Sequence, residues 1–181
     1  MWFKNLRAYR LSNPFDLSPE QLEEQLQSGL FQPCGKTQPL AMGFVAPLGE
    51  GTEALVHAAN GRILISTRRE EKLLPASVVR EQVEEKVALI EQEEGRKVYR
   101  KEKLRLKDEV TQDCLPRAFS RSSTLHAYID TRTNWLFVNT SSAARAEELI
   151  TMLRECIGTL PLSLPQVNQS PAAAMTSWLL H

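Results

Sequence analysis

The side chains best suited to binding chemistry are cations, and they are densest in residues 96–107. Seven Lys and Arg residues stand there against one acid, Glu102. Ion pairing along a helix needs opposite signs three or four residues apart, and this stretch has too few acids for it. The pattern favours contact with a polyanion such as a phosphate backbone, with a solvated helix face as the alternative. The seven are Arg96, Lys97, Arg100, Lys101, Lys103, Arg105 and Lys107.

A second candidate is the heptad 115–121, Leu-Pro-Arg-Ala-Phe-Ser-Arg, which places Phe119 between Arg117 and Arg121. In one interpretation Phe119 is an exposed wedge or interface anchor, and the arginines hold phosphates or a partner's carboxylates. In the other, the heptad is a loop whose phenylalanine folds back into the core. The residues alone leave both interpretations open.

A third basic group, Arg68, Arg69 and Lys72, lies at the end of a predicted strand. It is a further candidate for phosphate contact. Its neighbours Glu70 and Glu71 make pairing within the chain an equally reasonable interpretation.

Groups that could catalyse a reaction are sparse. His57 and His126 fall in predicted strands and are expected to be core or face residues, and His181 is terminal. No nucleophile elbow, phosphate-binding glycine loop or metal-ligand spacing is present. The clustered carboxylates that a metal-dependent nuclease needs are not evident either. We therefore expect no enzymatic activity, no cofactor and no metal site.

Composition limits the function classes further. The 22 Lys and Arg residues balance the 22 Asp and Glu residues, so only a local patch can attract an anion. Residues 61–125 hold such an excess, with 15 basic against 12 acidic residues. The cysteines, three in number and without a Cys-x-x-Cys pair, predict reduced thiols. No apolar run approaches the roughly 20 residues that span a bilayer, and the chain reads as cytoplasmic.

The elements that must position these groups indicate an α+β fold with antiparallel strands. Strands are predicted at 2–11, 41–46, 54–58 and 62–69. Asn60-Gly61 predicts a hairpin between the last two. Ser18 and Gln21 form a capping box around Pro19, which predicts a helix ending at Gly29.

Residues 76–114 have a helical pattern. Apolar residues Val79, Val83, Val87 and Ile90 make a narrow stripe of coiled-coil type. Gly95 predicts a bend or break, because glycine costs about 1 kcal/mol relative to alanine in a helix. An unbroken helix of this span would be roughly 55–60 Å long at about 1.5 Å per residue, so part of it would have to project or meet a partner.

After Pro116, a hairpin is predicted from strands at 122–130 and 134–139, then a helix at 141–156. The expected organisation is an N-terminal α+β region (1–75), a long helical segment (76–115), a hairpin and helix completing the α+β region (116–160), and a tail (161–181) that looks cut within an element.

Several longer motifs carry a resemblance to a known family. They are Trp-Phe-Lys-Asn-Leu at 2–6, Arg-Glu-Glu-Lys-Leu-Leu-Pro at 69–75, Leu-Lys-Asp-Glu-Val at 106–110, the heptad 115–121, and Ala-Ala-Arg-Ala-Glu at 143–147. Together they resemble the bacterial RdgC family over nearly the whole chain. The resemblance implies a nucleoid-associated protein that binds double-stranded DNA without sequence preference. It also implies inhibition of RecA-driven recombination and a role in replication fork repair.

The resemblance further implies a homodimer closed into a ring around a basic hole. Phe119 would serve DNA engagement or ring closure, and Arg117 belongs to the same motif. The cations of 96–107 are assigned from charge and not from the family. Family members are considerably longer, and the part beyond this chain would supply more of the ring wall.

A different class of function is also consistent with the residues. In a protein–protein adaptor, the 79–90 stripe would be a dimer seam and the basic run would dock acidic partners.

Overall fold

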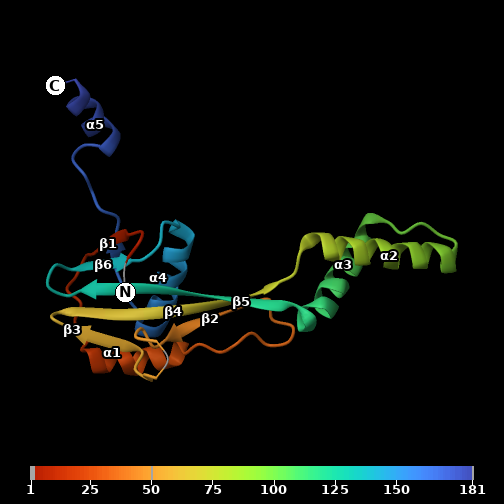
Figure 1. Cartoon of the computed structure of the whole chain (residues 1–181), viewed down its shortest axis with the longest axis horizontal. Coiled ribbons are helices and arrows are strands. Elements are labelled where there is room, and N and C mark those ends of the chain that lie inside the picture. The colour runs from red at the N-terminus through yellow and green to blue at the C-terminus, as the bar shows by residue number, and fades with distance from the viewer. Residues whose placement is uncertain (1–2, 50, 181) are drawn as a thin grey trace. The chain divides into compact units, whose positions relative to one another are not determined.

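The structure is a computed structural model that describes residues 3–49 and 51–180. Within these residues it has five α-helices, two 3₁₀ turns and seven strands (Figure 1). The strands are β1 (Arg7–Leu11), β2 (Leu40–Val45), β3 (Val56–Ala59), β4 (Arg62–Leu73), β5 (Phe119–Asp130), β6 (Trp135–Val138) and β7 (Leu162–Ser163). The helices and turns are α1 (Pro19–Leu26), α2 (Ala76–Glu94), α3 (Arg100–Cys114), α4 (Ala143–Ile157), α5 (Pro171–Leu179), η1 (Gln27–Gly29) and η2 (Leu115–Arg117).

The strands are hydrogen-bonded in the order β2-β4-β5-β6-β1-β7, and β3 also pairs with β4. The β1–β6, β1–β7, β3–β4 and β5–β6 pairs are antiparallel. The predicted α+β class with antiparallel strands is confirmed. Contacts divide the chain into two compact units. Unit 1 comprises residues 1–28, 46–66 and 126–181, and unit 2 comprises residues 29–45 and 67–125, so β4 and β5 contribute to both.

In unit 1, helix α1 begins with the predicted capping box. The Ser18 hydroxyl accepts from the Gln21 backbone N–H at 3.2 Å, and the Gln21 side chain accepts from the Ser18 N–H at 2.9 Å. The chain then continues through η1 to Gly29, the predicted end. Strand β1 begins at Arg7 and is shorter than the strand predicted at 2–11. Residues 3–6 precede β1, and residue 2 lies outside the described residues.

Both predicted hairpins are present in unit 1. Asn60 and Gly61 have φ of 52° and 75°, the left-handed pair that a tight turn between β3 and β4 requires. In the β5–β6 turn, the Asp130 carboxylate accepts from the backbone N–H of Arg132 at 3.0 Å and of Thr133 at 3.2 Å. These bonds fix the register in which Asp130 pairs with Trp135.

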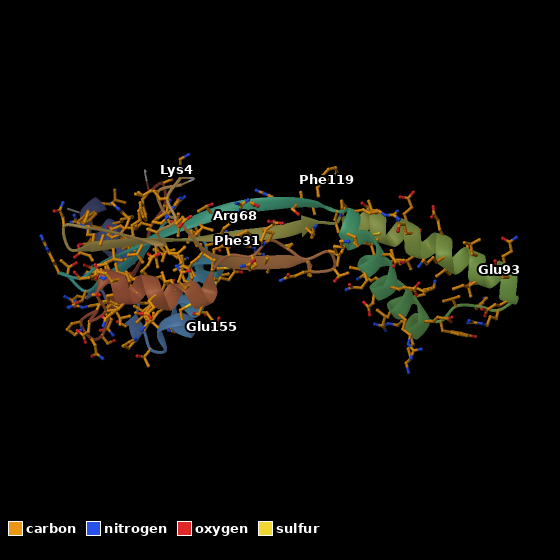
Figure 2. The ribbon with its side chains drawn as sticks, turned by 90° about the horizontal axis from the view of Figure 1, so that it is seen from below. Lys4, Phe31, Arg68, Glu93, Phe119 and Glu155 are labelled. Carbon is orange, nitrogen blue, oxygen red and sulfur yellow. The ribbon has the colours of Figure 1, made fainter. Side chains whose placement is uncertain are left out.

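The core of unit 1 lies between its helices and one face of the strands. Figure 2 shows α1 and α4 on the same side of β4 and β5. The Ser142 hydroxyl caps α4 by accepting from the Arg145 N–H at 3.3 Å. Helix α5 has no buried residue. The fully buried core side chains include Leu22, Leu26, Ile65, Ile129, Leu136, Leu149, Ile150 and Leu153.

Aromatic rings line up on neighbouring strands β5 and β6. Tyr128 stacks on Phe137 at 4.9 Å between centroids, and Phe137 stacks on Trp135 at 6.0 Å. Phe3 meets Tyr128 edge-on at 5.3 Å, and the Arg10 guanidinium lies 5.8 Å from the Trp135 ring. All five residues belong to unit 1.

Unit 2 contains the helical pair α2 and α3. The break expected at Gly95 is confirmed: its φ is 63°, in the left-handed region, and its N–H bonds the Glu91 carbonyl at 3.1 Å. After it α3 runs back along α2 instead of extending it. Val87 of the stripe is buried with Val98 and Leu106. Val79 is also buried and Val83 and Ile90 are partly buried, so most of the stripe that was considered as a dimer seam is covered within the chain. Residues 76–114 contain two helices that pack on each other and not one long helix.

Candidate functional site

Unit 2 contains a groove of about 870 Å³. It is lined by the end of β4, one face of α2 and one face of α3. Five of its lining residues are cations, and none is an Asp or Glu. We call this hollow the basic groove. Its cations are Lys72, Arg80, Arg100, Lys103 and Lys107, and its uncharged lining residues are Pro39, Leu74, Ala76, Val79, Val83, Val98, Tyr99, Leu104, Thr111 and Leu115.

Helical spacing explains which cations of 96–107 reach the groove. Arg100, Lys103 and Lys107 are separated by three and four residues, so they share one face of α3. Lys101 and Arg105 lie on another face and do not line the groove. The basic stretch, treated as one surface in the sequence, is therefore divided into groove cations and outer cations. The outer cations are Lys97, Lys101 and Arg105, all exposed.

Arg96 is held within the chain. Its Nη1 and Nη2 atoms each donate to a carboxylate oxygen of Glu102 at 2.7 Å, and its Nε atom donates to Glu94. The hydrogen bonds from Arg96 lower the pKa of Glu102, and the same bonds raise the pKa of Arg96. The expectation that all seven cations lack a partner is wrong for Arg96. The other six form no ion pair with any described residue.

Several acids of α2 and α3 are paired with groups outside the groove. Lys86 contacts Glu109 at 2.8 Å and Asp113 at 3.4 Å, and these bonds raise the pKa of Lys86. Glu91 accepts from the Val98 backbone N–H at 2.9 Å. These three carboxylates therefore do not neutralise the groove cations, and no Asp or Glu lines the groove.

The cations of β4 have separate environments. The Arg68 guanidinium lies 5.2 Å from the centre of the Phe31 ring and donates to the Ser122 hydroxyl at 3.1 Å. Arg69 contacts Glu71 at 3.4 Å, as the pairing interpretation predicted. Lys72 lines the basic groove. The three residues thus do not act as one cluster.

Phe119 is exposed, with 84% of its surface accessible. Figure 2 shows its side chain pointing away from the ribbon at the start of β5. The interpretation in which it folds back into the core is therefore wrong for this chain. Together with Arg117, Leu73 and Val78 it lines a second hollow of about 630 Å³. Arg121 is exposed two residues further along β5.

Sequence reasoning missed three groove residues. Arg80, Tyr99 and Leu104 were not among the predicted site residues. Tyr99 and Leu104 are 75% and 55% exposed. The spacing of 100, 103, 104 and 107 was a usable signal, because it defines one face of a helix. The partner face on α2 could be found only once the reversal after Gly95 was known.

His57 and His126 lie in strands β3 and β5, as predicted, and His181 lies outside the described residues. His126 Nδ1 is 2.6 Å from the hydroxyl of Ser66, which is fully buried, and burial lowers the pKa of His126. Within residues 3–49 and 51–180, no three His, Cys, Asp or Glu side chains are grouped to share a metal ion. No helix in the same residues is long and apolar enough to cross a membrane.

A family model described as "Putative exonuclease, RdgC" matches residues 1–181, the whole chain. The chain belongs to the RdgC family. Among curated RdgC relatives, each named "Recombination-associated protein RdgC", the protein of Aeromonas hydrophila is 47% identical over 179 residues, 99% of this chain and 59% of the relative. The protein of Pseudomonas entomophila is 48% identical over 180 residues, with the same coverage of both chains.

The RdgC protein of Colwellia psychrerythraea is 45% identical over 179 residues, 99% of this chain and 58% of the relative. The chain thus spans about three fifths of the length of these RdgC relatives. The resemblance found in the motifs of the sequence is confirmed at the level of the family.

Proposed function

We propose that this RdgC chain takes part in binding double-stranded DNA without sequence preference. The proposal is supported most directly by six cations of residues 97–107 that form no ion pair with a described residue, because clustered cations repel one another until an external anion neutralises them. Phosphates supply such charge at regular intervals and carry no sequence information. Further proposed contacts are Arg68, Lys72, Arg117 and Arg121. Arg69 and Arg96 are weaker candidates, because Arg69 pairs with Glu71 and Arg96 pairs with Glu94 and Glu102.

The proposal extends to the assembly and its role. The protein acts as a ring-shaped homodimer around DNA, with Phe119 serving ring closure or DNA engagement. By occupying DNA it inhibits RecA-mediated recombination and acts in replication fork repair, as a cytoplasmic, nucleoid-associated protein. The relatives' name, which contains "recombination-associated", supports this role.

We also propose that the activity is binding and not catalysis. The family description contains the word exonuclease, so the two functions need a direct comparison. End-labelled duplex incubated with a full-length family member and Mg²⁺ should keep its length while it is retarded in a gel. Shortening of the duplex that depends on the protein would refute the non-enzymatic proposal.

A salt series tests the DNA proposal. Log affinity for random duplexes should fall linearly with log salt, and about five phosphate contacts would give a slope near −4.5. Lys101→Gln should make the slope shallower by about 0.9, because one phosphate contact is lost. Lys4→Gln, which removes another exposed lysine from a distant part of the sequence, is the matched control. Absence of binding at low salt, for this chain and for a full-length relative, would refute the proposal.

The second candidate function is the protein–protein adaptor. The apolar side chains that line the basic groove favour this function, because phosphates make no favourable contact with apolar side chains.

A further inference from the structure

The basic groove combines two kinds of surface that a nucleic-acid backbone does not use together. Its floor includes Val79, Val83 and Val98, and two of its exposed residues are Tyr99 and Leu104. Phosphates contact cations and hydrogen-bond donors, whereas exposed apolar side chains gain free energy only when another apolar group covers them. The groove is therefore complementary to an amphipathic ligand, one that carries both charged and apolar groups.

Its dimensions favour a peptide over a duplex. A hollow of about 870 Å³ is of the size that takes ligands a few side chains long. Arg100 and Lys107 are seven residues apart on α3, which places them about 10 Å apart along the helix axis. That distance equals about three residues of an extended peptide. Acids spaced in this way could meet the cations of α3 in succession.

Charge complementarity requires that the ligand carry negative charge. The five groove cations form no ion pair with a described residue, while Glu94 and Glu102 pair with Arg96. Lys72 and Arg80 come from other elements than the three cations of α3. A ligand in the groove would thus meet cations on more than one side of the apolar floor.

We infer that the basic groove binds an acidic amphipathic peptide segment of a partner protein, in which Asp or Glu residues are interspersed with large apolar residues. The acids contact the groove cations, and the apolar side chains cover the exposed Leu104 and Tyr99 and whatever part of Val83 the chain leaves open. The inference goes beyond the DNA proposal, because it concerns the floor of the groove and not the outer cations.

The test uses three labelled synthetic peptides of equal length and fluorescence anisotropy with this chain. In the first peptide Asp or Glu alternates with Leu or Phe, the second is polyaspartate, and in the third the acids of the first become Asn or Gln. Burial of one large side chain is enough for about a tenfold gain in affinity. The first peptide should therefore bind at least about tenfold more tightly than either control. Equal binding of polyaspartate would overturn the inference.

Variants locate the binding and separate it from DNA binding. Leu104→Gln should weaken the first peptide about tenfold. Leu89→Gln should not, although Leu89 is a helical residue with 56% exposure against 55% for Leu104. Lys103→Gln should weaken the binding of both the first peptide and duplex DNA. Lys101→Gln should weaken the binding of DNA only, and Leu104→Gln should weaken the binding of the peptide only. Equal effects of the two leucine variants on the peptide would overturn the inference and leave the DNA proposal standing.

A second copy of the chain is the competing occupant. Light scattering after gel filtration would reveal it as a dimer that Leu104→Gln dissociates and that the first peptide does not bind. That combination would overturn the inference. A monomer that binds the peptide, or a dimer that binds it without dissociating, supports the peptide as occupant.

Discussion

The guanidinium of Arg96 and the carboxylate of Glu102 face each other through two parallel hydrogen bonds of 2.7 Å. This pair joins the connection after Gly95 to the first turn of α3. Arg96 also contacts Glu94 at the end of α2. One arginine from the basic stretch thus ties two helices together, which is a structural role that a count of cations does not reveal.

The Arg96–Glu102 pair predicts a pH dependence. Arg96 lowers the pKa of Glu102 from its ordinary value of 4.5, so this contribution to stability is complete above pH 4.5 and is lost as the pH falls through the folded-state pKa. Arg96→Gln should therefore have a lower free energy of unfolding than the unsubstituted chain at pH 6. Between pH 5 and about pH 3, the free energy of unfolding should fall less in this variant than in the unsubstituted chain. Urea unfolding followed by circular dichroism measures both. Lys101→Gln is the control, and an identical pH dependence in the two variants would contradict the assignment.

Glu23 should be important for stability. Its two carboxylate oxygens accept the backbone N–H groups of Leu55 at 2.8 Å and Val56 at 2.7 Å, where β3 begins. Glu23→Ala removes both acceptors, and each N–H left without a partner costs about 1–3 kcal/mol if water cannot reach it. The free energy of unfolding from urea titration measures the loss. Glu24→Ala, the exposed neighbour on α1, should change it by less than about 0.5 kcal/mol.

Gly43 should tolerate no side chain. A Cβ atom there would overlap the backbone of Phe31, where Leu30 and Phe44 form a parallel bridge. Gly43→Ala should lower the melting temperature, with a cost of about 1–3 kcal/mol or more, because backbone must move to admit the methyl group. At Gly35 the nearest atoms to an added Cβ are 3.7 Å away, so Gly35→Ala is the matched variant. Equal melting temperatures for the two would refute the argument.

Phe119→Ala should separate function from folding. Because Phe119 is 84% exposed, its loss should change the free energy of unfolding by less than about 0.5 kcal/mol. If the proposed role is right, the same variant weakens duplex binding or dimerisation of a full-length relative that carries it. Phe44→Ala, at a fully buried phenylalanine, should instead cost about 3–5 kcal/mol. A large loss of stability in Phe119→Ala would mean that Phe119 packs in the core.

Local signals in the sequence were sufficient for much of the fold. The capping box at Ser18, the Asn60-Gly61 turn and the break at Gly95 each depend on a few neighbouring residues, and each was predictable for that reason. The length of β4 was not, since it extends beyond the predicted end at Arg69 through Glu70, Glu71 and Lys72 to Leu73, and charged residues of this kind are depleted in strands.

The candidate site was predictable only in part. Charge density indicated the basic stretch, but the division of its cations depends on how α3 returns along α2. Arg80 joins the groove only through that packing, and Arg96 leaves the set only because Glu94 and Glu102 come within reach. These are contacts between residues brought together by the fold, for which one sequence carries no direct signal.

The distribution of tryptophan gives a spectroscopic signal that excludes unit 2. None of the three tryptophans, at positions 2, 135 and 178, falls within residues 29–45 and 67–125, which make up unit 2. Indole fluorescence therefore does not report unit 2 directly. Ellipticity at helical wavelengths reports both units, because α2 and α3 of unit 2 have 19 and 15 residues, and α1, α4 and α5 of unit 1 have 8, 15 and 9. Coincident denaturation curves from the two signals would mean that β4 and β5, which both units share, couple their unfolding into one cooperative transition.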